Sequence, residues 1–253
     1  MNFFSLFKRN IIYKLKKKIN VDRDFFISKS IDELFFYYGS DKSNKFKYTN
    51  KSGHGYSKFY EKYLKKIKNK KLNILEIGSY SGSSAAAFKK YFPKSKIYCF
   101  DINISNFKYF SKDIKVFGLD IKNKNSINKT LKKIIKNNNS EYFDLIVDDG
   151  SHNLSDMLFA FKSLFKHLSK DGFYVIEDYM LPNKYKYNRD IKDILVDKML
   201  SHLIKKKLFN SKTLNKMDQI NFHKKIKKIY IGKGKLIDSN ICFIKKKSKW
   251  VLN

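Results

Sequence analysis

Cysteine, proline and arginine are all scarce in this sequence of 253 residues, which holds two cysteines, two prolines and three arginines. Cys99 and Cys242 are too few and too far apart for a disulfide scaffold or a cysteine zinc cluster. No apolar run approaches the ~20 residues that a membrane-spanning helix requires. With 42% hydrophobic residues, the chain is long enough to bury a full core, and we expect it in a reducing compartment, the cytoplasm.

Positive charge is abundant instead, because 55 Lys and Arg residues stand against 23 Asp and Glu residues and give a net charge of +32. Of these 55 cations 52 are lysine. Proteins that read nucleic acids usually favour arginine for its bidentate contacts. A drift in composition therefore explains the charge better than a dedicated nucleic-acid function, and we expect no specific nucleic-acid partner. Attraction to anionic surfaces stays open.

The first 20 residues combine apolar side chains with a lysine run, and two interpretations stay open. A helix packed on its own domain or on a second subunit is favoured over an amphipathic helix lying weakly on the inner membrane surface. If the helix packs on a second subunit, the protein is a homo-oligomer. A short helix, a polar loop and a second helix are predicted next. We divide the chain into a helical extension with a lid loop at 1–70 and a larger domain at 71–253.

Short apolar runs alternate with amphipathic segments after residue 71. This alternation predicts an α/β fold with a mostly parallel sheet. Residues 183–228 are mostly helical in pattern, and the runs at 229–231 and 240–245 predict a terminal antiparallel hairpin. The expected strands lie near 72–77, 96–101, 115–119, 143–148 and 172–177, and the expected helices near 83–91, 126–137 and 154–168.

A glycine turn follows the first predicted strand. Gly78 and Gly82 let the backbone approach a ligand closely, and the helix behind them offers N–H groups at its start. Asp101 ends the next strand, where its carboxylate can accept both hydroxyls of a ribose. The glycine spacing and the carboxylate of Glu76 disfavour a pyrophosphate, but they suit the cationic methionine end of S-adenosylmethionine. We therefore predict a nucleoside-cofactor site.

Two acidic motifs end the fourth and fifth predicted strands: Asp148 and Asp149 in DDGSH, and Glu177 and Asp178 in IEDY. Both strand ends lie at the carboxyl edge of the sheet, where open α/β folds bind ligands. Four carboxylates held together against their mutual repulsion need a cation. Their oxygen atoms suit Mg²⁺, Mn²⁺ or Ca²⁺, and the lack of clustered Cys or His argues against zinc.

The glycine turn resembles the first motif of the class I S-adenosylmethionine-dependent methyltransferases, which implies a Rossmann-like fold. DDGSH with IEDY resembles the metal-dependent macrolide-sugar O-methyltransferases of the mycinamicin and macrocin type and the cephalosporin hydroxylase-like proteins, and YGSDK and HGY resemble their N-terminal signature. The resemblance implies Mg²⁺ or Mn²⁺ on Asp149, Glu177 and Asp178, with His152 as the general base. We assign these residues to the cofactor: Glu76, Gly78, Ser79, Tyr80, Gly82, Asp101, Asp148 and Asp120, whose alternative role is a helix N-cap.

Methyl transfer to a hydroxyl requires that its proton be removed. A divalent ion chelated by vicinal sugar hydroxyls lowers the pKa of the hydroxyl, and a neutral imidazole at His152 can take the proton. His54, in a glycine-flanked loop, is either a lid or substrate contact or a structural loop residue. The other three histidines, His167, His202 and His223, are expected at the surface or at helix ends.

We therefore expect an enzyme that methylates a sugar hydroxyl of a glycan, a nucleotide sugar or a glycosylated metabolite. Two alternatives stay open. The basic charge favours an RNA methyltransferase, although the acidic cluster disfavours it. A non-catalytic lysine-rich module that binds anionic membranes or nucleic acid is the second alternative.

Overall fold

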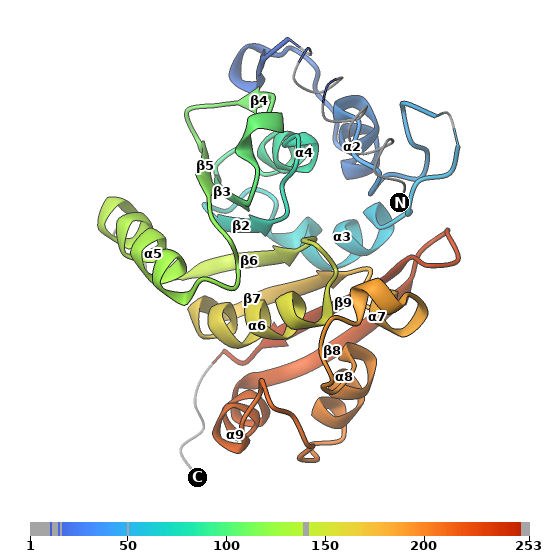
Figure 1. Cartoon of the computed structure of the whole chain (residues 1–253). Coiled ribbons are helices and arrows are strands. Elements are labelled where there is room, and N and C mark those ends of the chain that lie inside the picture. Colours follow the sequence, from blue (N-terminus) through green and yellow to red (C-terminus); the bar gives the residue numbers. More distant parts are fainter. Residues whose placement is uncertain (1–10, 12–14, 16, 50, 139–141, 249–253) are drawn as a thin grey trace.

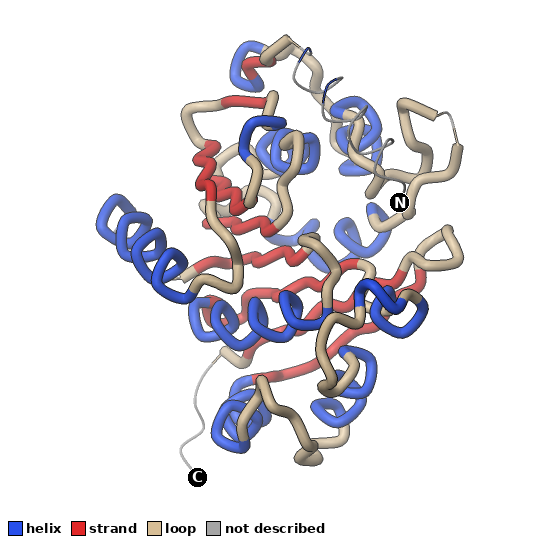
Figure 2. The backbone as a smooth tube through the Cα atoms, in the orientation of Figure 1, coloured by secondary structure: helices blue, strands red, loops and turns tan. Residues whose placement is uncertain are grey.

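The computed structural model describes residues 11, 15, 17–49, 51–138 and 142–248. Its centre is a seven-stranded sheet in the order β5-β3-β2-β6-β7-β9-β8, crossed by helices on both faces (Figures 1 and 2). The first five strands in this order pair in parallel, whereas β9 is antiparallel to both of its neighbours. The strands are β2 (Asn73–Ile77), β3 (Lys96–Asp101), β5 (Ile114–Gly118), β6 (Phe143–Asp148), β7 (Leu168–Glu177), β8 (Ile226–Lys233) and β9 (Asn240–Lys246).

The predicted α/β fold, with its parallel sheet and terminal hairpin, is confirmed. Strand β7 begins at Leu168, earlier than the predicted 172, because a shift in register against β6 lets residues 168–172 run on along the sheet. The hairpin of β8 and β9 is also longer than the two apolar runs that predicted it. A two-stranded parallel sheet of β1 (Ile19–Asn20) and β4 (Tyr109–Phe110) lies apart from the main sheet.

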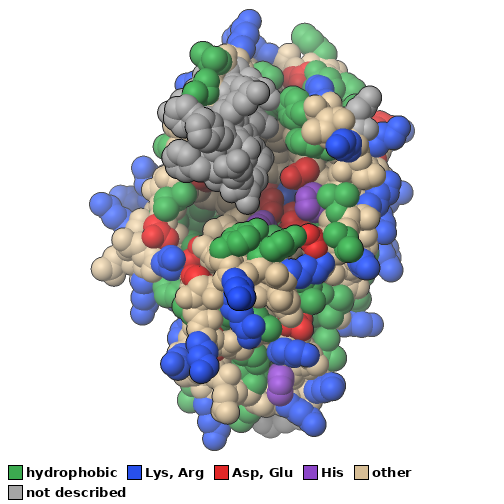
Figure 3. All heavy atoms as spheres, turned by 45° about the vertical axis from the view of Figure 1, so that its right-hand side comes forward, with side chains coloured by type: hydrophobic (Ala, Val, Ile, Leu, Met, Phe, Trp, Pro, Cys, Tyr) green, Lys and Arg blue, Asp and Glu red, His purple; other side chains and the backbone are tan. Residues whose placement is uncertain are grey.

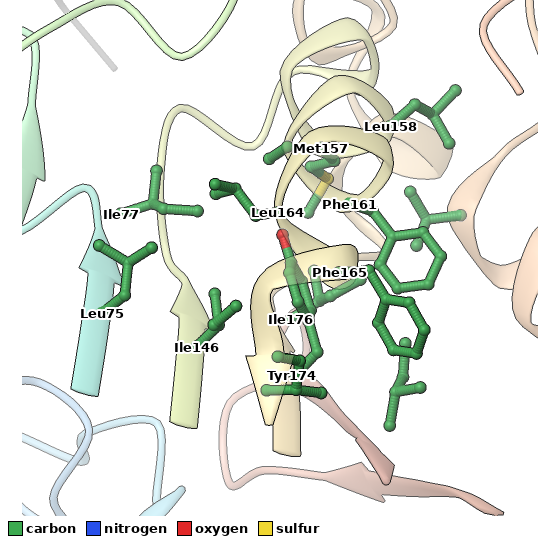
Figure 4. Close-up of a cluster of buried hydrophobic side chains, with 14 of the residues drawn as sticks. Leu75, Ile77, Ile146, Met157, Leu158, Phe161, Leu164, Phe165, Tyr174 and Ile176 are labelled. Atoms are coloured by element: carbon green, nitrogen blue, oxygen red, sulfur yellow. The ribbon is translucent and has the colours of Figure 1, made fainter. Parts of the chain in front are cut away.

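Side chains alternate between the two faces of each strand, which divides the core into two clusters. One cluster contains Ile146 and Ile176 and is covered by α5, α6, α8 and α9. Figure 4 shows the side chains of α6 lying over Ile146, Tyr174 and Ile176. The other cluster contains Leu145 and Val147 and is covered by α2, α3 and α4. The helices are α2 (Ile31–Tyr38), α3 (Ser57–Leu64), α4 (Ser83–Tyr91), α5 (Lys124–Asn138), α6 (Leu154–Leu164), α7 (Leu181–Lys184), α8 (Val196–Ile204) and α9 (Lys216–Lys225).

The segment before the sheet folds as the sequence predicts: helix α2, a loop, and helix α3. Helix α2 begins at the N-cap Ser30, whose side chain accepts from the Glu33 N–H, and ends at Gly39 in a left-handed conformation with φ 78°. A side chain rarely adopts this φ, so glycine suits the position. The loop from 39 to 56 then leads to α3. It brings polar side chains of this segment to the carboxyl ends of β6 and β7.

No helix among the described residues is long and apolar enough to cross a membrane. The expectation of weak membrane contact concerns residues 1–20, and most of these lie outside the described residues.

Candidate active site

A cavity of about 770 Å³ opens at the carboxyl edge of the sheet. Figure 3 shows acidic and histidine side chains gathered in a hollow near the middle of this face, with lysine and arginine side chains spread around it. Seven of the predicted site residues line the cavity: Gly78, Ser79, Tyr80, Asp101, Asp120, Asp149 and His152. The structure therefore brings together the glycine turn, the ends of β3 and β5, and the DDGSH motif.

The turn between β2 and α4 depends on two glycines, Gly78 and Gly82. Gly78 has φ 79°, and a Cβ atom on it would lie 2.0 Å from the carbonyl oxygen of Asp149. The ends of β2 and β6 can thus approach closely only because position 78 has no side chain. Gly82, also at φ 79°, is the N-cap of α4 and provides no side-chain bond to the first turn of the helix. The start of α4 is a position that favours negative or electron-rich ligand groups.

The carboxylate of Asp101 is held in place by backbone donors. Its Oδ2 accepts from the Tyr80 N–H at 2.7 Å and its Oδ1 from the Asn103 N–H at 2.8 Å. Each oxygen keeps a second lone pair, so the carboxylate can still accept hydrogen bonds from a ligand in the cavity. Asp120 has a comparable arrangement after β5, where its Oδ1 accepts from the Lys122 N–H at 2.9 Å.

Glu76 lies beneath the turn, fully buried. Its Oε1 accepts from the Ser84 hydroxyl at 2.5 Å, whereas its Oε2 has no hydrogen-bond partner among the described residues. Burial raises the pKa of Glu76 to about 7, against the opposing effects of Lys42 and Ser84. A buried carboxylate oxygen without a donor is costly, so this atom fits a cationic donor supplied by a ligand.

Three carboxylates gather where β6 and β7 end: Asp149, Glu177 and Asp178. The ammonium group of Lys42 bridges Asp149 Oδ2 and Glu177 Oε2, the latter at 2.5 Å. The Tyr60 hydroxyl donates to Glu177 Oε1 at 2.5 Å. The two carboxylates hold the pKa of Lys42 well above its usual value, although burial alone would lower it. Lys42 is therefore a cation in the interior.

Asp178 is held by side chains from the loop that leads to α3. The Tyr56 hydroxyl donates to Asp178 Oδ1, and the His54 Nδ1 lies 3.5 Å from the same oxygen. Burial alone would raise the pKa of Asp178, but its hydrogen bonds with His54 and Tyr56 and the charge of His54 lower it. For His54, burial alone would lower the pKa, whereas Asp178 raises it to about 9, so the imidazole is charged at neutral pH.

His152 follows the DDGS sequence in a left-handed conformation with φ 57°. Its Nε2 lies 3.6 Å from Asp149 Oδ1, and its Nδ1 is buried without a hydrogen-bond partner among the described residues. Ligand atoms of Asp149, His152 and Asp178 all lie within 4.8 Å of one another, so these three side chains could hold a metal ion. Glu177 is not part of this group, since it faces Lys42 and Tyr60.

Asp148 is placed differently from the prediction that it binds the cofactor. It is absent from the cavity lining, and its Oδ2 accepts from the Tyr174 hydroxyl at 3.4 Å in the core. Successive residues of a strand point to opposite faces, so Asp148 turns toward the Tyr174 side while Asp149 turns toward Lys42. Burial and the charge of Asp149 raise the pKa of Asp148 to about 8. Of the other predicted site residues, Glu76, Gly82, Glu177 and Asp178 also lie outside the lining.

Sequence reasoning missed Lys42, Tyr56 and Tyr60 as individual site residues. Lys42 and Tyr56 lie inside the YGSDK and HGY motifs, so a signal was present, but a single lysine among 52 carries no mark of its own. Tyr60 lies on α3 and belongs to none of the sequence motifs named above.

Residues 75–179, from β2 to just after β7, match a family described as a methyltransferase domain. This match covers the glycine turn, Asp101, DDGSH and IEDY, and it leaves the segment that carries Lys42, Tyr56 and Tyr60 outside the matched residues.

Two curated relatives are named as O-methyltransferases. The chain is similar to an L-olivosyl-oleandolide 3-O-methyltransferase of Streptomyces antibioticus, with 29% identity over 58% of this chain and 36% of the relative. It is also similar to a mycinamicin VI 2''-O-methyltransferase of Micromonospora griseorubida, with 28% identity over 49% of this chain and 31% of the relative. The chain thus spans about a third of the length of these relatives.

A solved structure of the MycE methyltransferase from the mycinamycin pathway, in complex with Mg, SAH and mycinamycin VI, has the same fold. The match has a TM-score of 0.64 and 22% identity, and it covers 86% of this chain and 54% of that chain. The resemblance to macrolide-sugar O-methyltransferases and the Rossmann-like class I fold are confirmed.

Proposed function

We propose that the protein is an S-adenosylmethionine-dependent O-methyltransferase that uses a divalent cation and acts on a sugar hydroxyl. The observation that carries this proposal is the adjacency, in one cavity, of the glycine turn and Asp101 with Asp149 and His152, beside which Asp178 lies. The first group suits a nucleoside cofactor and the second suits a chelated hydroxyl. The relatives that methylate polyketide sugars support the same class of reaction.

The residues around the glycine turn fit S-adenosylmethionine. Asp101 would accept the ribose hydroxyls, and Asp120 lies on the cavity wall where β5 ends, in reach of the adenine side. The unpartnered Oε2 of Glu76 would support the amino group of the methionine part. The bonds that Asp101 already makes to backbone N–H groups fix its orientation before the cofactor enters, which lowers the entropic cost of binding.

The carboxylate cluster fits Mg²⁺ or Mn²⁺, because oxygen ligands are what these ions prefer. Asp149 and Asp178 would hold the ion, with Glu177 as the third carboxylate that the family resemblance implies. When bound, the ion would lower the pKa of a sugar hydroxyl and orient it. His152 is then the base, and its Nε2, which faces Asp149, would take the proton of the acceptor hydroxyl.

The charge of the cavity favours an uncharged acceptor. The lining contains the aspartates Asp41, Asp101, Asp120, Asp149 and Asp156, whereas its lysine, Lys42, is already paired with carboxylates. In a chain with a net charge of +32, the hollow is therefore acidic. A polyanion such as RNA would be repelled from it, and a neutral glycan or glycosylated metabolite would not. This argues against the RNA methyltransferase alternative.

The test is an acceptor screen by mass spectrometry with S-adenosylmethionine as donor. Neutral glycosides, nucleotide sugars and RNA are compared, each with Mg²⁺ and with excess chelator. We expect methylation of a neutral glycoside, lost with chelator and restored by Mg²⁺ or Mn²⁺, while cofactor binding measured by calorimetry persists. Full activity in excess chelator would remove the metal from the proposal, and methylation of RNA alone would replace the acceptor class.

A further inference from the structure

Lys42 reaches the carboxylate cluster from outside the matched methyltransferase domain, on the loop between α2 and α3. Its side chain is 2% exposed, and its ammonium bridges Asp149 Oδ2 and Glu177 Oε2. Its backbone is fixed as well, because its carbonyl accepts from the N–H groups of Tyr56 at 2.8 Å and Ser57 at 3.1 Å, where α3 begins. The position of the positive charge is thus set by the fold and not by a flexible surface side chain.

The ammonium occupies the kind of position a metal ion would take between two carboxylates. Tyr60 donates to the other oxygen of Glu177, so both oxygens of that side chain are engaged. The remaining oxygen of Asp149, Oδ1, faces His152. A divalent ion that binds Asp149 together with Asp178 must therefore approach a fixed positive charge, and one that binds Glu177 must displace it.

We propose that Lys42 is a positioning residue that acts as the resident cation between Asp149 and Glu177 and competes with the divalent ion for the oxygens of these two carboxylates. This inference rests on the proposed metal site. In the absence of metal, Lys42 offsets the repulsion between two buried carboxylates and keeps them in their orientations. In its presence, the same charge weakens binding of the divalent ion.

Two consequences follow from this competition. The cluster is preformed before the ion arrives, since a buried carboxylate pair without any cation would be strongly destabilising. The ion also binds less tightly than three carboxylates would otherwise allow, because a unit charge a few ångströms away acts strongly in a buried site.

The experiment measures Mn²⁺ binding directly, without turnover, by electron paramagnetic resonance of free Mn²⁺ and by calorimetry. Lys42→Met removes the charge and keeps an apolar chain of similar length. Lys45→Met is the matched control, because Lys45 lies in the same loop but is exposed. Lys42→Arg keeps the charge. We expect Lys42→Met to bind Mn²⁺ about tenfold tighter or more, and the other two variants to bind as the wild type does.

Thermal unfolding with and without Mn²⁺ supplies a second readout. We expect Mn²⁺ to raise the unfolding temperature of Lys42→Met by more than that of the wild type. If Lys42→Met folds only in Mn²⁺, that dependence supports the proposal in itself. If it does not fold at all, Lys42→Gln takes its place, because its amide can still donate hydrogen bonds to both carboxylates without a charge.

Unchanged or weaker Mn²⁺ binding by the uncharged variants would overturn the proposal and leave Lys42 with a purely structural role. If neither the wild type nor any variant binds Mn²⁺, the metal site itself is wrong, and this inference fails with it. The two failures are therefore distinguishable.

Discussion

Individual residues in strained backbone conformations gather around the candidate site. Tyr80, His152 and Asp178 are not glycines, yet their φ angles are 45°, 57° and 50°. Such conformations cost about 1–3 kcal/mol each and persist only where surrounding contacts hold them. Here the contacts are visible: the Tyr80 N–H donates to Asp101, and Asp178 is held by Tyr56 and His54. The strain fixes side chains that extended backbone would direct elsewhere.

His152 is the residue whose loss should stop methyl transfer without damage to the fold. Asparagine tolerates the left-handed conformation but cannot act as a base at neutral pH, so His152→Asn separates the two roles. We expect turnover on a defined acceptor to fall by roughly 10²–10⁴-fold, with the unfolding temperature and the affinities for cofactor and Mn²⁺ near wild type. Wild-type turnover would make His152 structural, and a large loss of Mn²⁺ affinity would make it a metal ligand.

Asp101 should matter for cofactor binding alone. Asp101→Ala removes the acceptor for ribose hydroxyls and also releases the Tyr80 and Asn103 N–H groups. We expect S-adenosylmethionine to bind more weakly by roughly 1–3 kcal/mol, as measured by calorimetry. Asp101→Asn, which keeps the size and one acceptor oxygen, should lose less. Equal affinity for wild type and Asp101→Ala would exclude Asp101 from the site.

How far the sequence predicted these residues depends on where each one lies along the chain. Asp101 and Asp149 could be found because parallel strands bring their carboxyl ends to one edge of a sheet. The direction of the Asp148 side chain depends on the alternation of side chains along the strand. The sequence analysis did not apply this alternation to Asp148, because it treated the acidic motif as one group. Lys42 could not be found in this way, because it meets Glu177 across 135 positions of sequence through the packing of a loop.

The period of the hydrophobic residues was sufficient to predict which segments form helices and which form strands, but it did not predict where each helix or strand begins and ends. The five parallel strands lie where apolar runs lie, since β2, β3, β6 and β7 are buried on both faces and the edge strand β5 is partly buried. The early start of β7 depends on pairing with Phe143 of β6, and no local pattern encodes that partner. Helix α6 ends at Leu164 and a 3₁₀ turn, Phe165–His167, completes the predicted helical stretch.

One carboxylate joins the segment before α8 to the loop before α9. Asp193 Oδ2 accepts from the N–H and the hydroxyl of Thr213, at 2.9 and 2.8 Å, and its Oδ1 accepts from the Ile194 N–H. Burial alone would raise the pKa of Asp193, but these hydrogen bonds lower it. The ionised side chain thus ties two elements of the C-terminal region together.

Replacing Asp193 should therefore destabilise the fold in a pH-dependent way. We expect Asp193→Ala to lower the free energy of unfolding by roughly 1–3 kcal/mol at pH 7. A lowered pKa in the folded state contributes stability above the ordinary Asp value of about 3.9, and this contribution is lost as the pH falls through the folded-state pKa. Denaturant unfolding at several pH values should show the difference from wild type shrinking below about pH 4. Asp193→Asn, which keeps an acceptor, should show a smaller loss.

Across the whole molecule, charge is divided between an acidic hollow and a basic exterior. Figure 3 shows Lys and Arg side chains over much of the visible surface, with Asp, Glu and His side chains in the hollow. The net charge of +32 left attraction to anionic surfaces open but said nothing about the sign of the cavity, because folding selects which few residues face it. The acidic lining and the basic surface therefore have to be assigned different functions.

Binding of RNA should accordingly be a property of the surface and not of the site. Lysine contacts to phosphate act through counterion release and do not read the base sequence. We therefore expect two RNAs of equal length and unrelated sequence to bind with equal affinity. Both should lose affinity by about 10³-fold or more between 50 and 200 mM salt. Fluorescence anisotropy at both salt concentrations measures this. Because the cavity repels phosphates, saturating S-adenosylmethionine should leave RNA affinity unchanged, and RNA should not inhibit methylation of a neutral acceptor at 200 mM salt. The opposite result is sequence-selective RNA binding that persists at 200 mM salt and competes with the neutral acceptor. It would place RNA in the cavity and support the hypothesis of an RNA methyltransferase.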